Sequence, residues 1–238
     1  MTTAPPAVLA LDFDGVLCSS AREVLVVGVR AWADLESVAQ LPATARALAH
    51  EVPGDWTAVD GSATWSRYTD LLPLGNRAED FGVALHALAS GAAIEDQEAY
   101  DRFYASHDQS WLDAFHDEFY RQRARLRETD LATWLGLHRP FDRFLEVLRR
   151  RREEVALAVA TAKDRRSVAL LLEHFGVADL IPEDAVLDKD TGVDKTAHMQ
   201  ALLDRHDVPP SHITFVDDKV NHLEKVAPVG VRPVLAAG

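Results

Sequence analysis

The sequence predicts an α/β fold: a parallel sheet that is interrupted, after its first strand, by a long all-helical segment. Three observations predict this fold. From about residue 140 onwards, short apolar runs alternate with helical patterns, as in parallel βαβ units. A separate apolar run occupies residues 8–11. The region of about 19–138 between them contains no convincing strand pattern.

The first strand is expected at residues 8–11, where a short apolar run is typical of a strand buried on both faces. The run ends in Asp12-Phe13-Asp14-Gly15. Because Gly adopts backbone conformations that other residues avoid, we expect a tight turn there. Such a turn lets Asp12 and Asp14 face the same ligand.

The region of residues 19–138 is expected to form several short helices. It is rich in Ala, Leu, Glu, Arg and aromatic residues, with breaks at Pro42, Pro53-Gly54, 73–75 and Gly91. The aromatic side chains are expected to form the core between these helices.

Beyond Pro140, strands and helices are expected to alternate as parallel βαβ units. The sequence predicts helices over 141–151, 165–175, 195–205 and 220–226, and strands over 155–161, 185–187, 213–217 and 231–235.

This pattern divides the chain into two domains. Residues 1–18 and 139–238 are expected to form the α/β core, and residues 19–138 an inserted helical domain. The chain is expected to cross between them near 17–20 and 136–140.

Composition and charge narrow the class of protein. The 238 residues are 47% hydrophobic and 26% charged, which is typical of a globular chain with a substantial core. A formal charge of −13 repels polyanions, so neither nucleic acid nor an anionic membrane is expected as a partner. The single Cys18 fits a reducing compartment. Without a membrane span or a secretion signal in the sequence, we expect a cytoplasmic protein.

Polar side chains follow three of the predicted strands, at the point where each strand ends. Asp12 and Asp14 follow the first, Thr161 ends the second, and Asp217 and Asp218 end a later one. Because ligands of open parallel sheets bind beyond the carboxyl ends of the strands, we expect these side chains to form one site. Four carboxylates at one edge repel each other unless a cation neutralises them. An oxygen-only set of ligands favours Mg²⁺.

A lysine is expected at the same edge. Lys195 begins a predicted helix and can contact an anionic ligand, whereas Lys189 competes for this role but lies in a predicted turn, so Lys195 is preferred. A carboxylate nucleophile, a metal, a hydroxyl group and a lysine together suit phosphoryl transfer. The alternative is that Asp12, Asp14 and Asp217 only cap turns and helices, which explains any one of them but not the ordered set.

These residues resemble the motifs of the haloacid dehalogenase superfamily, hydrolases that use an aspartate nucleophile. Asp12-Phe13-Asp14 is similar to the first motif, Thr161 to the second, Lys195 to the third, and Asp217-Asp218 to the fourth. The resemblance covers about 1–18 and 139–238, and the helical region resembles the family's cap by position only. It implies a Rossmann-like core interrupted by an all-helical cap domain.

The resemblance implies a role for each catalytic residue. Asp12 attacks phosphorus and forms an aspartyl-phosphate. Asp14 protonates the leaving oxygen and then deprotonates the water that hydrolyses the intermediate. Thr161 and Lys195 hold phosphate oxygens.

The resemblance also implies how Mg²⁺ is held. The ligands are the Asp12 carboxylate, the Asp14 backbone carbonyl and Asp218. Asp217 is either a further ligand or a support for the others.

The function expected from these residues is that of a Mg²⁺-dependent phosphatase acting on a small phosphorylated metabolite. Asp14 favours phosphate esters over halides, because a halide leaves without a proton. The alternatives are a phosphomutase or other phosphoryl transferase of the same superfamily, or a non-catalytic binding protein on the same fold.

The protein is expected to be a monomer or a homodimer. Polar residues of the insertion are candidates for reading the substrate: Arg30, Arg67, Tyr68, Arg121 and Arg125.

Overall fold

A computed structural model of the chain describes residues 7–75, 77–188, 190–192 and 194–236. The chain divides into two compact units. The sheet unit comprises Met1–Ser20 and His138–Gly238, and the helical unit comprises Ala21–Leu137. In the parts of the chain that the structure describes, no helix is both long and apolar enough to cross a membrane.

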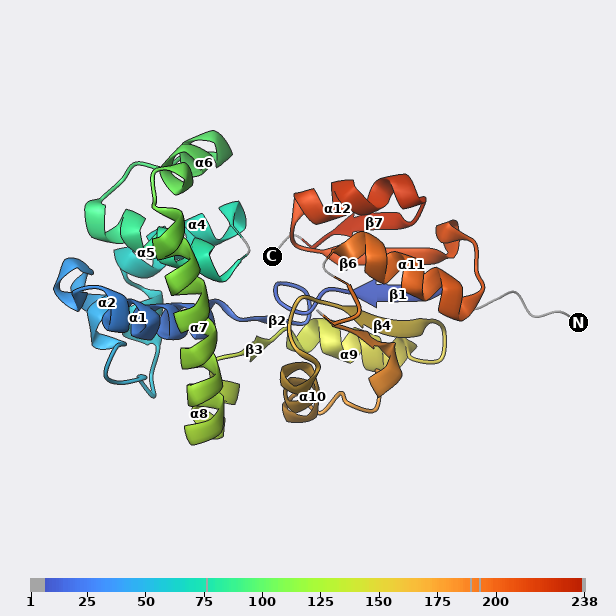
Figure 1. The fold of residues 1–238 in the computed structure, drawn as a ribbon. Coiled ribbons are helices and arrows are strands. Elements are labelled where there is room, and N and C mark those ends of the chain that lie inside the picture. The colour runs from blue at the N-terminus through green and yellow to red at the C-terminus, as the bar shows by residue number, and fades with distance from the viewer. Residues whose placement is uncertain (1–6, 76, 189, 193, 237–238) are drawn as a thin grey trace, which may run out of the picture. The chain divides into compact units, whose positions relative to one another are not determined.

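The sheet unit is built on five parallel strands in the order β5-β4-β1-β6-β7 (Figure 1). Leu11, the last residue of β1, pairs with Val159 of β4 and Val216 of β6. This register brings the carboxyl ends of the three strands to one edge of the sheet. The strands are β1 (Val8–Leu11), β4 (Ala156–Ala160), β5 (Val186–Leu187), β6 (Ile213–Asp217) and β7 (Arg232–Leu235).

Helices cover both faces of this sheet. The chain moves across the sheet from β1 to β4 to β5 in one direction. It then moves from β5 to β6 to β7 in the opposite direction. Right-handed crossovers therefore place α9 (Asp142–Arg151) and α10 (Arg165–His174) on one face. They place α11 (Lys195–His206) and α12 (Val220–Val226) on the opposite face, as Figure 1 shows. Short 3₁₀ helices complete the unit: Glu183–Ala185, Pro210–His212 and Ala227–Val229.

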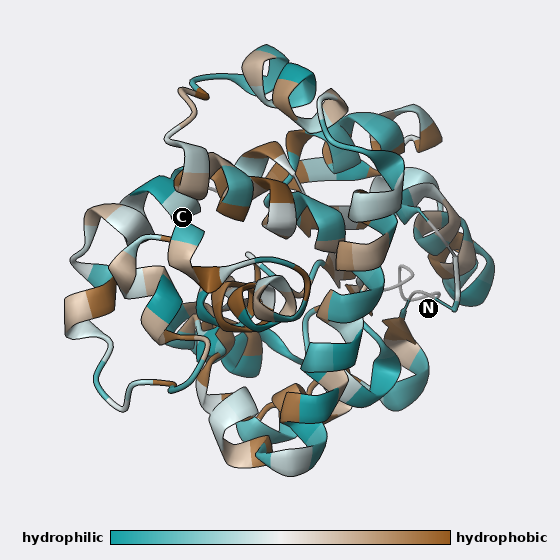
Figure 2. Ribbon diagram, turned by 60° about the vertical axis from the view of Figure 1, so that its left-hand side comes forward, coloured by the Kyte–Doolittle hydropathy of each residue, from teal (hydrophilic) through white to brown (hydrophobic). Residues whose placement is uncertain are grey.

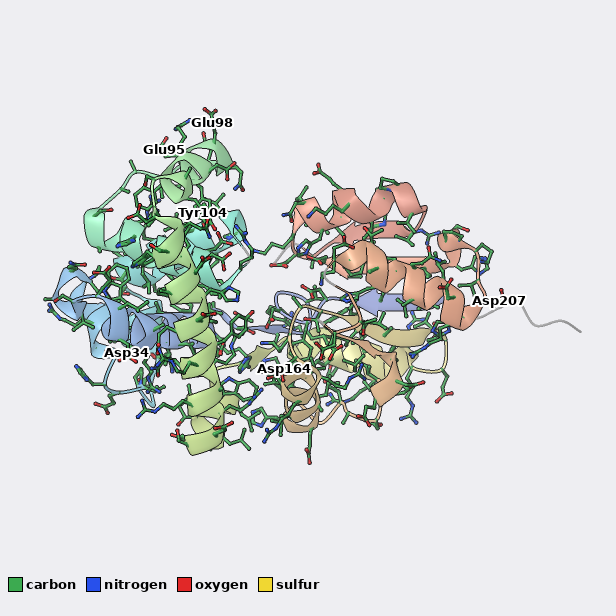
Figure 3. The ribbon with its side chains drawn as sticks, in the orientation of Figure 1. Asp34, Glu95, Glu98, Tyr104, Asp164 and Asp207 are labelled. Carbon is green, nitrogen blue, oxygen red and sulfur yellow. The ribbon has the colours of Figure 1, made fainter. Side chains whose placement is uncertain are left out.

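Aspartates fix where two of these helices begin. Asp164, labelled in Figure 3, accepts a hydrogen bond from the Ser167 backbone N–H (3.0 Å) at the start of α10. Asp194 accepts one from the Ala197 N–H (3.0 Å) at the start of α11. Each carboxylate satisfies a backbone donor that the first helical turn leaves without a partner. The second cap also places Lys195 as the first residue of α11.

Two short strands were not predicted from the sequence. β2 (Cys18–Ser19) and β3 (Arg139–Pro140) pair antiparallel, where the chain leaves and re-enters the sheet unit. The Phe141 N–H extends the ribbon by donating to the Leu17 carbonyl oxygen (3.0 Å). A strand of two residues is too short to show an alternating pattern, so the sequence carried no signal for it.

The helical unit contains the short helices that the Pro and Gly positions predicted. Helices in Figure 2 carry both hydrophobic and hydrophilic residues, as expected of amphipathic helices around a core. Among the largest fully buried side chains are Trp32, Tyr68, Phe115 and Trp134. The helices are α1 (Ala21–Leu35), α2 (Ala43–Ala47), α3 (Thr57–Asp60), α4 (Ala63–Leu71), α5 (Ala78–Ser90), α6 (Gln97–Ala105), α7 (Gln109–Thr129) and α8 (Leu131–Gly136), with 3₁₀ helices at Val38–Gln40 and Leu72–Leu74.

Polar contacts join α1 to α7. The guanidinium of Arg123 donates from Nε and Nη2 to the two carboxylate oxygens of the buried Glu23, each at 2.7 Å. Farther along α1, Asp34 accepts a hydrogen bond from Gln122 (2.8 Å), and Figure 3 labels it. The bidentate pair of Arg123 and Glu23 is strong and directional, so it fixes the register of α1 and α7.

Candidate active site

The strand ends bring several of the candidate residues to one edge of the sheet. The Asp12 N–H donates to the Val216 carbonyl oxygen, and the Thr161 N–H to that of Leu187, both at 2.9 Å. Backbone pairing therefore continues one residue beyond β1 and β4. Asp217 is the last residue of β6. Asp12, Thr161 and Asp217 are all buried.

Lys195 forms an ion pair with the first aspartate. Its Nζ donates to Asp12 Oδ1 (2.7 Å) and to the Ala160 carbonyl oxygen (2.6 Å), and lies 3.6 Å from Asp217 Oδ2. The side chain is buried, so this charge is poorly screened by water. Lys189, the competing lysine, lies outside the described residues.

Three carboxylates meet at the same place. Asp12, Asp217 and Asp218 each offer one oxygen, and these oxygens all lie within 4.8 Å of one another. An all-oxygen set of donors matches the preference of Mg²⁺. The residues that the structure describes therefore fit the metal expected from the sequence.

The pKa values of Asp12 and Asp218 indicate that the positive charge of Lys195 does not neutralise the carboxylates of the site. Burial raises the pKa of Asp12, and Asp217 and Asp14 add to that effect, although Lys195 opposes it. Burial also raises the pKa of Asp218, to about 6. Each shift arises mainly from burial, which the positive charge nearby does not fully offset. A divalent cation between them would supply that charge.

Asp217 is held differently, by donors on both of its oxygens. The Lys219 N–H donates to Oδ1 (2.8 Å), and His222 Nδ1 lies 3.0 Å from Oδ2. Burial of Asp217 acts to raise its pKa, but the His222 hydrogen bond and the charge of Lys195 outweigh it and lower the pKa. Asp217 is therefore anionic and fixed in place.

Asp14 lies at the more open part of the site, with 42% of its side chain exposed. The Ser20 hydroxyl donates to its Oδ1, and Lys163 Nζ lies 3.3 Å from its Oδ2. Ser20, Lys163 and His222 were not among the functional residues predicted from the sequence. The one available signal was that Lys163 stands two residues after Thr161, at the end of a predicted strand.

Gly15 makes the turn after Asp14 and lies close to the Asp218 side chain. Its φ is +82°, in the left-handed region that favours Gly. A Cβ at this position would lie 2.4 Å from the Asp218 carboxylate carbon. The close approach of the turn to Asp218 therefore depends on the absence of a side chain.

Gly15→Ala is expected to destabilise the protein, because it adds both backbone strain and a clash with Asp218. Strain at one such position costs about 1–3 kcal/mol. The free energy of unfolding, measured by urea denaturation, should fall by at least that amount. Gly136→Ala is the matched control, since a Cβ there meets nothing within 4 Å. Equal stability of the two variants would show that the turn relaxes freely.

Several of the polar candidates of the helical unit contact neighbours within that unit. Tyr68 is fully buried, and burial raises the pKa of its hydroxyl. Arg67 donates to the Ala92 carbonyl oxygen (2.9 Å), and Arg121 forms an ion pair with Glu118. Burial lowers the pKa of Arg30, and the charge of Arg125 lowers it further. The charge of Asp130 acts in the opposite direction on Arg30.

Comparisons with known proteins agree with the fold. A family model for haloacid dehalogenase-like hydrolases matches residues 6–227. No curated protein matches the chain.

Solved structures share the fold at low sequence identity. A haloacid dehalogenase-like hydrolase from Streptococcus pneumoniae is 12% identical, with a TM-score of 0.62 over 98% of this chain and 85% of that one. A protein described as a predicted phosphoglycolate phosphatase, from Haemophilus somnus, is 17% identical, with a TM-score of 0.61 over 98% and 86%. A subfamily IA hydrolase from Geobacter sulfurreducens is 15% identical, with a TM-score of 0.52 over 97% and 89%. Because the family model spans nearly the whole chain, the protein belongs to the haloacid dehalogenase-like hydrolases.

Proposed function

We propose that the protein is a Mg²⁺-dependent phosphatase that hydrolyses a small phosphorylated metabolite through an aspartyl-phosphate on Asp12. One observation carries the proposal. A buried carboxylate, Asp12, is paired with a buried lysine and lies within 4.8 Å of two further carboxylate oxygens. The arrangement combines a nucleophile with positive charge and with ligands for a hard cation.

Asp12 is the proposed nucleophile. Lys195 binds its Oδ1, and among the described residues no hydrogen bond engages Oδ2. Oδ2 is therefore the oxygen that forms the bond to phosphorus while the ester P–O bond breaks. Lys195 holds the carboxylate in one orientation, and its charge offsets that of the incoming phosphate.

Asp14 is the proposed proton donor and acceptor. It gives a proton to the leaving ester oxygen in the first step, and it takes one from the attacking water in the second. Its side chain is 42% exposed, against 30% for Asp218 and 11% or less for Asp12 and Asp217. This exposure suits a group that exchanges protons with substrate and water.

The Asp12 and Asp218 carboxylates and the Asp14 backbone carbonyl are proposed to hold Mg²⁺. When bound, the metal neutralises charge on the acids and on the phosphate. Both oxygens of Asp217 already accept hydrogen bonds from the protein, which favours a supporting role for that residue. Thr161 is proposed to bind a phosphate oxygen through its hydroxyl group.

Removal of divalent cations is expected to abolish phosphate release, and Mg²⁺ is expected to restore it. Ca²⁺ should restore little activity, because its longer bonds and higher coordination number misplace the phosphate relative to Asp12. The measurement is phosphate release after exhaustive chelation and after addition of each ion. Full activity of the chelated protein would contradict the metal requirement.

The substrate class is tested with a panel of small phosphate esters in the presence of Mg²⁺. The panel includes 2-phosphoglycolate, because one structural relative is described as a predicted phosphoglycolate phosphatase. Release of phosphate from at least one ester, absent in Asp12→Asn, supports the proposal. If no ester is hydrolysed above background, the phosphatase proposal fails and a mutase or a binding protein takes its place.

A cytoplasmic location is proposed together with the phosphatase function, in keeping with the single cysteine.

A further inference from the structure

A second buried lysine lies at the proposed site and has no role in the mechanism above. Lys163 stands in the loop between β4 and α10, two residues after Thr161. Only 3% of its side chain is exposed, and its Nζ lies 3.3 Å from Asp14 Oδ2. Among the described residues, Asp14 is the one carboxylate that forms an ion pair with it. Since burying a lone ammonium group is costly, the pairing with Asp14 explains why the side chain lies there.

Lys163 and Ser20 both hold the Asp14 carboxylate. Ser20 donates to Oδ1 and Lys163 contacts Oδ2, so the carboxylate is bound at both oxygens. Rotation of a carboxylate about its last bond is otherwise nearly free. Two anchors on different segments of the chain restrict that rotation. Asp14 nevertheless remains 42% exposed, so a ligand can still reach it.

The two lysines at this edge have different partners. Lys195 contacts Asp12, Ala160 and Asp217, whereas Lys163 contacts Asp14. The Lys163 backbone N–H also donates to the Thr161 hydroxyl oxygen (3.2 Å). The nucleophile and the proton-transfer group therefore each have a lysine of their own.

From this geometry we infer that Lys163 is a positioning residue for proton transfer by Asp14, an inference that rests on the proposed function. In the first step the ester P–O bond breaks, a bond from Asp12 to phosphorus forms, and the proton of Asp14 passes to the leaving oxygen. Lys163 holds Asp14 where that proton reaches the oxygen. It takes no part in the attack by Asp12, which Lys195 orients.

Leaving groups of different acidity separate this role from a structural one. Phenol, like the Tyr side chain, has a pKa of about 10 and needs a proton as it leaves, whereas 4-nitrophenol is more acidic and needs little help. We therefore compare kcat/KM for phenyl phosphate and 4-nitrophenyl phosphate, because kcat/KM reports the steps up to cleavage of the ester bond. Lys163→Met should lower the value about 10²-fold for phenyl phosphate, as expected for a misplaced catalytic group, and far less for 4-nitrophenyl phosphate.

A double-mutant cycle with Asp14→Asn supplies the second readout. If Lys163 acts through Asp14, Lys163→Met should cause no further loss when Asp14 is already Asn. Lys163→Arg keeps the charge and should recover part of the phenyl phosphate activity. Lys225→Met, an exposed position on α12, is the matched control and should leave both substrates unaffected. If Lys163→Met does not fold, Lys163→Gln takes its place in the cycle.

The outcomes distinguish this inference from the proposed function. An equal loss on both esters, a loss that adds fully to that of Asp14→Asn, or a rise in KM alone would overturn the positioning role. The last result would make Lys163 a ligand of the substrate phosphate. If the wild-type protein hydrolyses neither ester nor any member of the panel, the phosphatase proposal itself is wrong and this inference falls with it.

Discussion

Asp12→Asn is expected to reduce phosphate release to background for every substrate. An amide cannot attack phosphorus as a carboxylate does, so no aspartyl-phosphate forms. The substitution keeps the size of the side chain, and Lys195 Nζ can still donate to the amide oxygen in place of Oδ1 (2.7 Å in the wild-type protein). The protein should therefore stay folded, as circular dichroism and thermal unfolding will show.

The matched control for this variant is Asp204→Asn, an exposed position on α11. It makes the same chemical change away from the site and should retain full activity. Near-normal phosphate release by Asp12→Asn would contradict the covalent mechanism. The site would then have to act by direct attack of water on the ester.

Lys195→Met is expected to lower both activity and stability. It leaves the buried Asp12 and Asp217 carboxylates without the ammonium that lies 2.7 Å from one and 3.6 Å from the other. Breaking a buried ion pair in this way typically costs about 3–5 kcal/mol. The pKa of Asp12, already raised by burial, should rise further, which leaves less of the anionic nucleophile. We expect kcat/KM to fall at least about 10²-fold.

Urea denaturation and phosphate release measured on the same preparation test both effects of Lys195→Met. The exposed Lys225→Met again serves as the control. Added Mg²⁺ should recover part of the stability, because the metal supplies charge to the same carboxylates. A stable and active Lys195→Met protein would show that Lys195 has no essential role, and Lys163 would then be the first alternative to test.

The strands β1 and β4 were predictable because most of their residues are buried. Residues 8–11 and 155–160 form continuous apolar runs, residues 213–217 are mostly apolar, and each segment contains an observed strand. The two-residue strands β2 and β3 are too short to carry such a pattern.

One rule about parallel sheets was enough to predict that the candidate residues lie at the same edge of the sheet. Ligands bind where the carboxyl ends of the strands meet, and the register of β1 with β4 and β6 places Asp12, Thr161 and Asp217 there. The contacts of Asp14 could not be predicted in this way. They depend on the conformation of the Gly15 turn and of the Lys163 loop, which no periodic pattern specifies.

The most direct test of this account is a search for the phosphoryl group on Asp12. The protein is mixed with Mg²⁺ and the best substrate of the panel, quenched in acid within the first turnover, digested and analysed by mass spectrometry. We expect one added phosphoryl group on the peptide that contains Asp12, its loss on treatment with hydroxylamine, and its absence in Asp12→Asn. Rapid phosphate release from a wild-type protein whose Asp12 is never modified would contradict this expectation.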